Sequence, residues 1–261
     1  MTAGEDPGRV DVGIEAGVAT VTLRRPGKLN ALTPEMLDQL GRAVDVVRAS
    51  AARALAIRGE GPRAFCVGAD ITRFAGLTPV GMLGWTAHGH RVFDALAALP
   101  QPSVAVLHGP AFGGGLELTL ACDLRVMSSD ATIGLPEVGL GTVPGWGGTE
   151  RLTELVGRAR AKDVVLARRT LDAETAQAWG VVSRCAPPDA LDAVVTDLLA
   201  RLCAAAPVAV GLAKAIIDAA ADGAPSGVLE RLAGAVTSST DDLALGIAGF
   251  RSRVAPSFTG R

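Results

Sequence analysis

Three consecutive glycines, Gly113-Gly114-Gly115, constrain the fold of this chain more than any other feature. They follow an apolar run, residues 103–107, that predicts a buried strand, and they precede an apolar segment, residues 116–121, that predicts a helix. Glycines at the start of a helix leave backbone N–H groups open and let a ligand approach the chain closely. The turn therefore predicts either a site for a phosphate or a developing negative charge, or only tight packing of the helix on the strand.

Up to about residue 182, the rest of the chain alternates short strands with helices. A hairpin of two strands, residues 9–15 and 18–24, is expected around Ala16-Gly17. Thr33-Pro34-Glu35 has the cap, proline and acid that begin a helix. Further strands are expected at residues 54–58, 64–67 and 123–127. Residues 72–91 follow no pattern that predicts an element. The order of strands and helices is typical of a layered α/β fold.

Beyond about residue 182 the pattern predicts helices only, at residues 189–204, 208–221, 227–236 and 241–250. A helix must restart at Pro207, so we place a boundary there. The chain then divides into a core, residues 1–206, and a helical C-terminal region, residues 207–261. The helical region is apolar and too small to be a strong domain alone, so we expect it to pack on a partner.

Composition excludes several classes of protein. Of 261 residues, 49% are hydrophobic and 20% charged, which excludes a disordered chain. A net charge of −2 gives no electrostatic footprint for nucleic acid. We expect no membrane span, because charges, glycines or prolines interrupt every long apolar run, and no targeting segment in the polar residues 1–10. The four cysteines are scattered singly, which indicates reduced thiols and a cytoplasmic protein.

Two glutamates lie beside glycine turns. Glu117 is in the first turn of the expected helix, where an acid gains about 0.3–1 kcal/mol from the helix dipole and needs no other role. Glu137 lies in a glycine-rich apolar stretch, so it is either an exposed loop acid or an acid kept there for a task. A second glycine turn, residues 144–149, is either a flexible connector or a source of a bare N–H group at Gly145.

Other chemistries find little support. The dinucleotide-binding pattern fails at Leu118, where a glycine is needed, and neither a serine-hydrolase nor a zinc-protease motif occurs. His88 and His90 are two residues apart and do not share a helix face, so we expect no metal site. Cys66 and Cys122 are better interpreted as small buried residues than as nucleophiles.

Taken together, these segments resemble the enoyl-CoA hydratase/isomerase family, the crotonase superfamily, from about Val18 to the C-terminus. The similar segments are Arg25-Pro26-Gly27-Lys28-Leu29-Asn30-Ala31-Leu32, Phe65-Cys66-Val67-Gly68-Ala69-Asp70, Phe112-Gly113-Gly114-Gly115-Leu116-Glu117-Leu118, Leu135-Pro136-Glu137-Val138-Gly139-Leu140-Gly141 and Pro144-Gly145-Trp146-Gly147-Gly148-Thr149. The resemblance implies an α/β fold, a crotonase-like spiral of ββα units, with an α-helical C-terminal region that builds trimers or dimers of trimers. It also implies an acyl-CoA thioester substrate, as in fatty acid metabolism, with no separate cofactor because CoA is part of the substrate.

The resemblance further implies a role for individual residues. The N–H groups of Ala69 and Gly114 would form an oxyanion hole for the thioester carbonyl. Glu117 and Glu137 would hold a water molecule, with Glu137 as the main proton-transfer group. Hydratases of the family carry both glutamates, so we predict an enoyl-CoA hydratase that adds water syn across the C2=C3 bond of a trans-2-enoyl-CoA. Substrate-binding positions would be Leu29, Ala31, Gly68, Ala69, Asp70, Ile71, Gly114, Pro136, Gly145 and Trp146.

Two departures from the family pattern stand out. Trp146 replaces a residue that is usually small, so we expect a reshaped acyl pocket. Ala167-Arg168 replaces a more usual Thr-Gly, without a functional explanation. The alternatives to hydration are another reaction on a CoA thioester, such as isomerisation, hydrolysis or carbon–carbon cleavage, and a non-catalytic binding protein on the same fold. The acidic balance and the intact site argue against the last of these.

Overall fold

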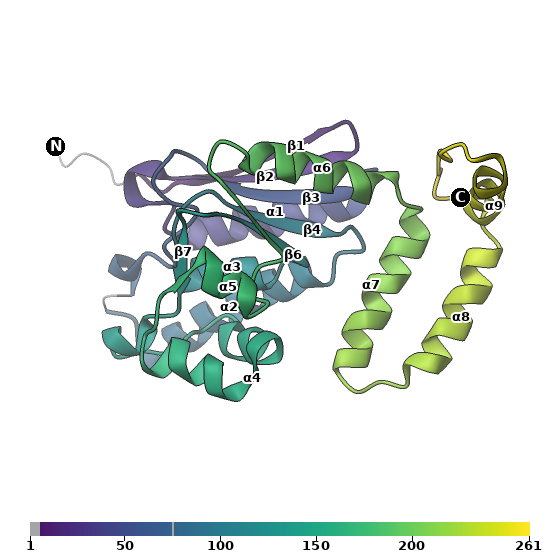
Figure 1. The fold of residues 1–261 in the computed structure, drawn as a ribbon. Coiled ribbons are helices and arrows are strands. Elements are labelled where there is room, and N and C mark those ends of the chain that lie inside the picture. Colours follow the sequence, from purple (N-terminus) through teal and green to yellow (C-terminus); the bar gives the residue numbers. More distant parts are fainter. Residues whose placement is uncertain (1–5, 75) are drawn as a thin grey trace.

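A six-stranded sheet forms the centre of the core (Figure 1). The computed structural model describes residues 6–74 and 76–261. The first two strands pair antiparallel across the predicted hairpin, and the others join in parallel, in the order β1-β2-β3-β4-β6-β9. The strands span β1 (Arg9–Glu15), β2 (Val18–Arg24), β3 (Ala54–Gly59), β4 (Ser103–Leu107), β6 (Leu124–Ser128) and β9 (Arg184–Ala186). A smaller sheet contains β5 (Ala111–Phe112), β7 (Thr132–Gly134) and β8 (Leu171–Asp172).

The sheet is covered on both faces, as its parallel strands require. All five residues of β4 are buried. Ala105 and Leu107 belong to the larger hydrophobic cluster, which includes the buried side of α1 (Pro34–Ala49). Val104 and Val106 point the other way, into a cluster that includes α6 (Leu191–Ala204). The alternation of side chains along each strand therefore divides the core into two layers.

The remaining helices of the core connect these strands and carry the site. Thr33 begins α1 as predicted, because its hydroxyl accepts a hydrogen bond from the Met36 amide at 3.2 Å. The others are α2 (Pro79–Ala97), α3 (Gly114–Leu120), α4 (Gly148–Leu166) and α5 (Ala173–Ala178). Among residues 6–74 and 76–261 there are also three short 3₁₀ turns, η1 (Pro26–Lys28), η2 (Ile71–Arg73) and η3 (Glu137–Leu140).

The C-terminal helices form an arm beside the core (Figure 1). They are α7 (Pro207–Ala221), α8 (Ser226–Ser238) and α9 (Asp241–Ser252). Together with α6 of the core, they confirm the four helices expected after residue 188. Neither α7 nor α8 contains a buried residue, and Phe250 of α9 is 87% exposed. The division of the chain into 1–206 and 207–261, and the oligomerisation assigned to the arm, stay predictions.

Two expectations about elements were wrong, and one helix was not predicted. Residues 64–67 form no regular strand, and Cys66 makes an isolated bridge to Ala111 as the chain bends into the site. The strand β9 lies in the region expected to be only helical, because three residues are too few to show a period. Residues 79–97 form the helix α2, which glycines such as Gly84 and Gly89 concealed by lowering its helix propensity.

Two expectations concern the chain as a whole. The prediction that residues 1–10 hold no targeting segment falls partly on residues 1–5, which lie outside the described residues. Within residues 6–74 and 76–261, no single helix is long and apolar enough to cross a membrane, although α6 and α7, bent by 105°, pass that test as a pair.

Candidate active site

The first turn of the site is held by backbone bonds between two distant segments. Leu32 and Ala69 form a parallel bridge, in which the Gly68 carbonyl accepts from the Leu32 amide at 2.7 Å. The Asp70 amide in turn donates a hydrogen bond to the Leu32 carbonyl at 2.8 Å. Gly68 has φ +102°, a conformation that favours glycine. The Ala69 amide donates to no other described residue, so the turn fixes an open N–H group.

The triple glycine forms the second turn, and it lies directly against the first. Gly113 has φ +54°, and α3 begins at Gly114, two residues earlier than predicted. A Cβ atom at Gly114 would lie 3.4 Å from the Ala69 nitrogen, and one at Gly68 would lie 3.1 Å from the Gly114 nitrogen. Among the described residues, the Gly114 amide also has no acceptor. Two open amides therefore lie side by side, as the oxyanion-hole prediction requires.

Glu117 is fixed by the loop that precedes α4. Its side chain is buried, with the residue 2% exposed, and its Oε1 accepts from the Trp146 amide at 2.7 Å and the Gly148 amide at 2.9 Å. A Cβ at Gly148 would lie 2.7 Å from Glu117 Cγ, so only glycine permits this approach. Burial raises the pKa of Glu117, and the two amide hydrogen bonds oppose that rise.

Glu137 faces the same space without such support. It begins η3, and neither carboxylate oxygen, both of which are buried, has a hydrogen-bond partner among the described residues. Its Oε1 lies 3.1 Å from the position of a Cβ at Gly113. Burial, and secondarily the charge of Glu117, raises the pKa of Glu137 to about 7. The interpretation of Glu137 as an exposed loop acid is therefore wrong.

A cavity of about 300 Å³ joins both glutamates to both turns. Most of the predicted substrate-binding residues line it, namely Gly68, Ala69, Ile71, Gly114, Pro136, Gly145 and Trp146. Three do not. The Leu29 carbonyl accepts from the Val67 amide, the Ala31 carbonyl accepts from Arg25, and the Asp70 carboxylate pairs with Arg25 at 2.7 Å. A role of these three in binding substrate stays a prediction.

One wall of the cavity comes from residues 72–91, where the sequence shows no pattern that predicts an element or singles out a residue. Met82, Trp85 and Thr86 of α2, together with Phe74 just after η2, line it. A signal was present in the spacing of Trp85, Gly89 and Phe93, which repeats every four residues as on one face of a helix.

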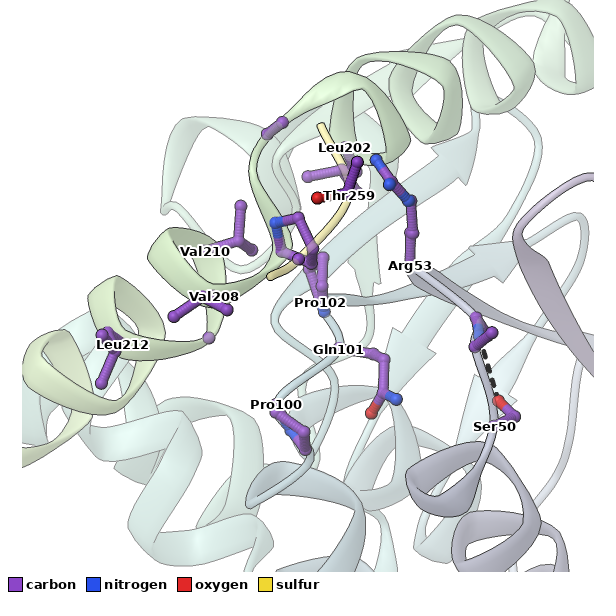
Figure 2. A pocket seen from close by; sticks show the side chains of 16 residues that line it. Ser50, Arg53, Pro100, Gln101, Pro102, Leu202, Val208, Val210, Leu212 and Thr259 are labelled. Carbon is purple, nitrogen blue, oxygen red and sulfur yellow. Dashed lines mark hydrogen bonds between the residues drawn. The ribbon is translucent and has the colours of Figure 1, made fainter. Parts of the chain in front are cut away.

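A larger cavity, of about 670 Å³, lies where α7 leaves the core. Figure 2 shows Val208, Val210 and Leu212 of α7 on one side and Pro100, Gln101 and Pro102 of the core on the other. The guanidinium of Arg53, also in this lining, donates to the backbone carbonyls of Cys203 and Phe258. This cavity marks the joint between the core and the C-terminal arm.

Two further kinds of reactive group were considered in the sequence, metal ligands and thiols. Within the described part of the chain, no group of three or more His, Cys, Asp or Glu residues could hold a metal ion. Cys66 and Cys122 are buried as expected, and burial raises the pKa of each thiol to about 12. Thiols with such pKa values stay protonated and are poor nucleophiles.

Comparison with known proteins shows to which family this chain belongs. The family model for enoyl-CoA hydratase/isomerase matches residues 13–261. The putative enoyl-CoA hydratase/isomerase YngF of Bacillus subtilis is 40% identical over 202 residues, covering 77% of this chain and 78% of YngF. The short-chain-enoyl-CoA hydratase of Clostridium acetobutylicum is 36% identical over 205 residues, or 78% of each chain. The crystal structure of an enoyl-CoA hydratase from Bacillus anthracis superposes with a TM-score of 0.93 at 30% identity, covering 97% of this chain and 99% of that one. The chain belongs to the enoyl-CoA hydratase/isomerase family and has the crotonase fold.

Proposed function

We propose that this protein is an enoyl-CoA hydratase, which adds water syn across the C2=C3 bond of a trans-2-enoyl-CoA to give a 3-hydroxyacyl-CoA. One observation carries the proposal: two carboxylic acids and two open amides line a single cavity. The names of the relatives at 36% and 40% identity support it.

The amides of Ala69 and Gly114 would receive the thioester oxygen. That oxygen gains negative charge in an enolate-like transition state when water adds to C3. Because the two turns are fixed by backbone bonds and tight glycine contacts, the donors need no reorganisation during the reaction. The removal of one such donor in other enzymes costs about 2.7–4 kcal/mol of transition-state stabilisation.

The two glutamates would divide the work on the water molecule. Oε1 of Glu117 accepts hydrogen bonds from two amides, so Oε2 is left to accept a hydrogen bond from the water. Neutral Glu137 would give its proton to C2 as the water oxygen bonds to C3, and would then take a proton from that water. Both new bonds form on the face of the double bond that the glutamates share, so addition is syn. A pKa of about 7 lets Glu137 both give and take a proton at neutral pH.

We also propose that the reaction needs no cofactor other than the CoA carried by the substrate, and that the C-terminal arm builds a homotrimer or a dimer of trimers. The exposed apolar side chains of the arm support an assembly, among them Ile217, Leu232 and Phe250. A native mass of three or six chains is expected, and a stable monomer would contradict the assembly.

Crotonyl-CoA tests the reaction, because hydration removes the absorbance of its conjugated thioester. We expect the wild type to remove it, and the Glu117→Gln and Glu137→Gln variants to lose most of that activity. Glu174→Gln, on the exposed face of α5, is a matched control that should behave as the wild type. No hydration by the wild type of any enoyl-CoA that it binds would overturn the proposal.

A further inference from the structure

An aromatic wall closes the inner side of the cavity. Trp146, which lines the cavity, is only 3% exposed. Its ring lies 5.2 Å from that of Trp85 and 5.4 Å from that of Phe93, both edge-to-face. Trp85 lies in turn 5.6 Å from Phe74. The four rings form a row from the fully buried Phe93 to the partly exposed Phe74, with Trp146 in contact with the substrate space.

Two glycines make room for the Trp146 indole. A Cβ atom at Gly89, in the middle of α2, would overlap the pyrrole part of the ring, including Nε1. A Cβ at Gly114 would overlap the opposite, benzene part at Cε3 and Cζ3. Glycine inside a helix costs about 1 kcal/mol relative to alanine, so Gly89 has a compensating purpose in holding the ring. The indole is thereby fixed between α2 and the oxyanion-hole turn.

The position of the ring relates it directly to the acyl group. Gly114 provides one of the two amides proposed to bind the thioester oxygen, and the indole packs against this same residue. Other residues that line the cavity, Ile71, Leu140 and Val143, are exposed to solvent. An acyl chain that starts at the amides and turns inward therefore meets the indole and, behind it, Phe93.

We propose that Trp146, seated in the notch left by Gly89, is the residue that restricts the substrate to short acyl chains. The inference rests on the proposed function, because it assumes that the acyl group of a CoA thioester occupies this cavity. The volume of about 300 Å³ is at the lower end for small-molecule pockets, in agreement with a short chain. Removal of the indole would join the space between Gly114, Gly89 and Phe93 to the cavity and admit a longer chain.

The first test measures kcat/KM of the purified full chain for trans-2-enoyl-CoA substrates of four, six, eight and ten carbons. One methylene that a pocket cannot accept costs about 10- to 200-fold. We therefore expect the wild type to lose at least tenfold between four and eight carbons, and Trp146→Ala to raise the eight-to-four ratio at least tenfold. Trp146→Leu and Trp146→Phe should fall between them in order of side-chain size, so the series is informative even if the alanine variant does not fold.

Trp179→Ala is the matched control. The guanidinium groups of Arg160 and Arg169 lie 4.9 and 4.8 Å from the centroid of the Trp179 ring, and Trp179 does not line the cavity. The same loss of an indole there should leave the chain-length ratio unchanged.

A second readout separates this inference from the proposed reaction. Butyryl-CoA and octanoyl-CoA are saturated and cannot be hydrated, so calorimetry reports binding alone. We expect Trp146→Ala to improve octanoyl-CoA binding relative to butyryl-CoA by about tenfold. If this shift occurs in a protein that hydrates nothing, the inference holds and the hydratase proposal fails. If folded Trp146 variants keep the wild-type ratio in both kinetics and binding, the acyl chain leaves by another route and the inference is wrong.

Discussion

The two sides of the cavity hold their carboxylates in opposite ways. On the α3 side, Glu117 is almost fully buried, and two amides of the following loop hold its Oε1 at 2.7 and 2.9 Å. On the η3 side, Glu137 has two buried oxygens without a described hydrogen-bond partner. The same functional group is thus anchored on one side and left unpaired on the other.

This difference shows how one cavity can give two carboxyl groups different tasks. Hydrogen bonds from amides favour the charged form, and they also fix the direction of the remaining oxygen, which suits an acid that positions a water molecule. An unpaired acid keeps a high pKa and moves its proton without breaking a strong hydrogen bond, which suits proton transfer. Because the two groups interact, their titration belongs to the pair.

The largest expected effect is the loss of proton transfer on the η3 side. Glu137→Gln should lower kcat by about 10³- to 10⁴-fold with little change in KM, since general acid–base catalysis contributes about 10²- to 10⁴-fold. Glu117→Gln keeps an oxygen that can accept from the two amides, so its loss should be nearer 10²-fold. Steady-state hydration of crotonyl-CoA measures both.

The order of these two losses decides whether the comparison is correct. If Glu117→Gln is the more damaging variant, the anchored acid transfers the proton and the roles are exchanged. The necessary control is that both variants keep the wild-type fold, measured by circular dichroism.

The next effect concerns the donors that both sides share. Gly114→Ala would force its methyl group against the Trp146 ring and within 3.4 Å of the Ala69 nitrogen. A misplacement of about 1 Å at such a site costs on the order of 10²-fold in rate. Gly13→Ala is the matched control, because a methyl at Gly13 of β1 meets nothing within 4 Å. Near-normal turnover by Gly114→Ala would mean that this amide is not an oxyanion donor.

A smaller effect appears in the pH dependence of the wild type. The neutral form of Glu137 gives the proton during hydration, and burial raises the pKa of this group to about 7. We expect kcat/KM for hydration to decline above pH 7 and to approach a tenfold loss for each further unit. A profile that is flat from pH 7 to pH 9 would show that the unpaired carboxyl does not titrate there, and the contrast with Glu117 would disappear.

The sequence was sufficient for the core because its signals are local. The hairpin strands at 9–15 and 18–24 have the predicted bounds, since period-2 alternation and the Ala16-Gly17 turn act within a few residues. The helix α2 was missed because Gly81, Gly84 and Gly89 oppose helix formation. The space that Gly89 leaves is occupied by Trp146, more than fifty positions away, and no local pattern contains that contact.

In the site, too, the features with local signals were predictable and the contacts between distant residues were not. Glycine turns and adjacent acids singled out both glutamates, and the family resemblance supplied their roles and half of the residues that line the cavity. The sequence analysis assigned the main proton transfer to Glu137 but could not show how the two glutamates are held, because the amides that bind Glu117 belong to Trp146 and Gly148, which are remote in the chain. Sequence spacing also could not show that the backbone groups around Leu29 and Ala31 are engaged in internal hydrogen bonds.

The smallest expected effect is on stability, and it isolates the unpaired acid. Folding raises the pKa of Glu137 from 4.5 to about 7, so between these pH values the folded chain holds a proton that the unfolded chain has lost. The free energy of unfolding of the wild type therefore falls as pH rises through this window, whereas Glu137→Gln lacks this contribution. With allowance for solvent screening of a half-buried group, we expect urea unfolding to show the variant about 1 kcal/mol more stable than the wild type at pH 8, with no difference below pH 4.5. Glu117 is present in both proteins, so the difference between them reports Glu137 together with its interaction with Glu117. The exposed Glu174→Gln should show no such trend. Parallel curves for Glu137→Gln and wild type would mean that the η3 side stabilises its charge as well as the α3 side does.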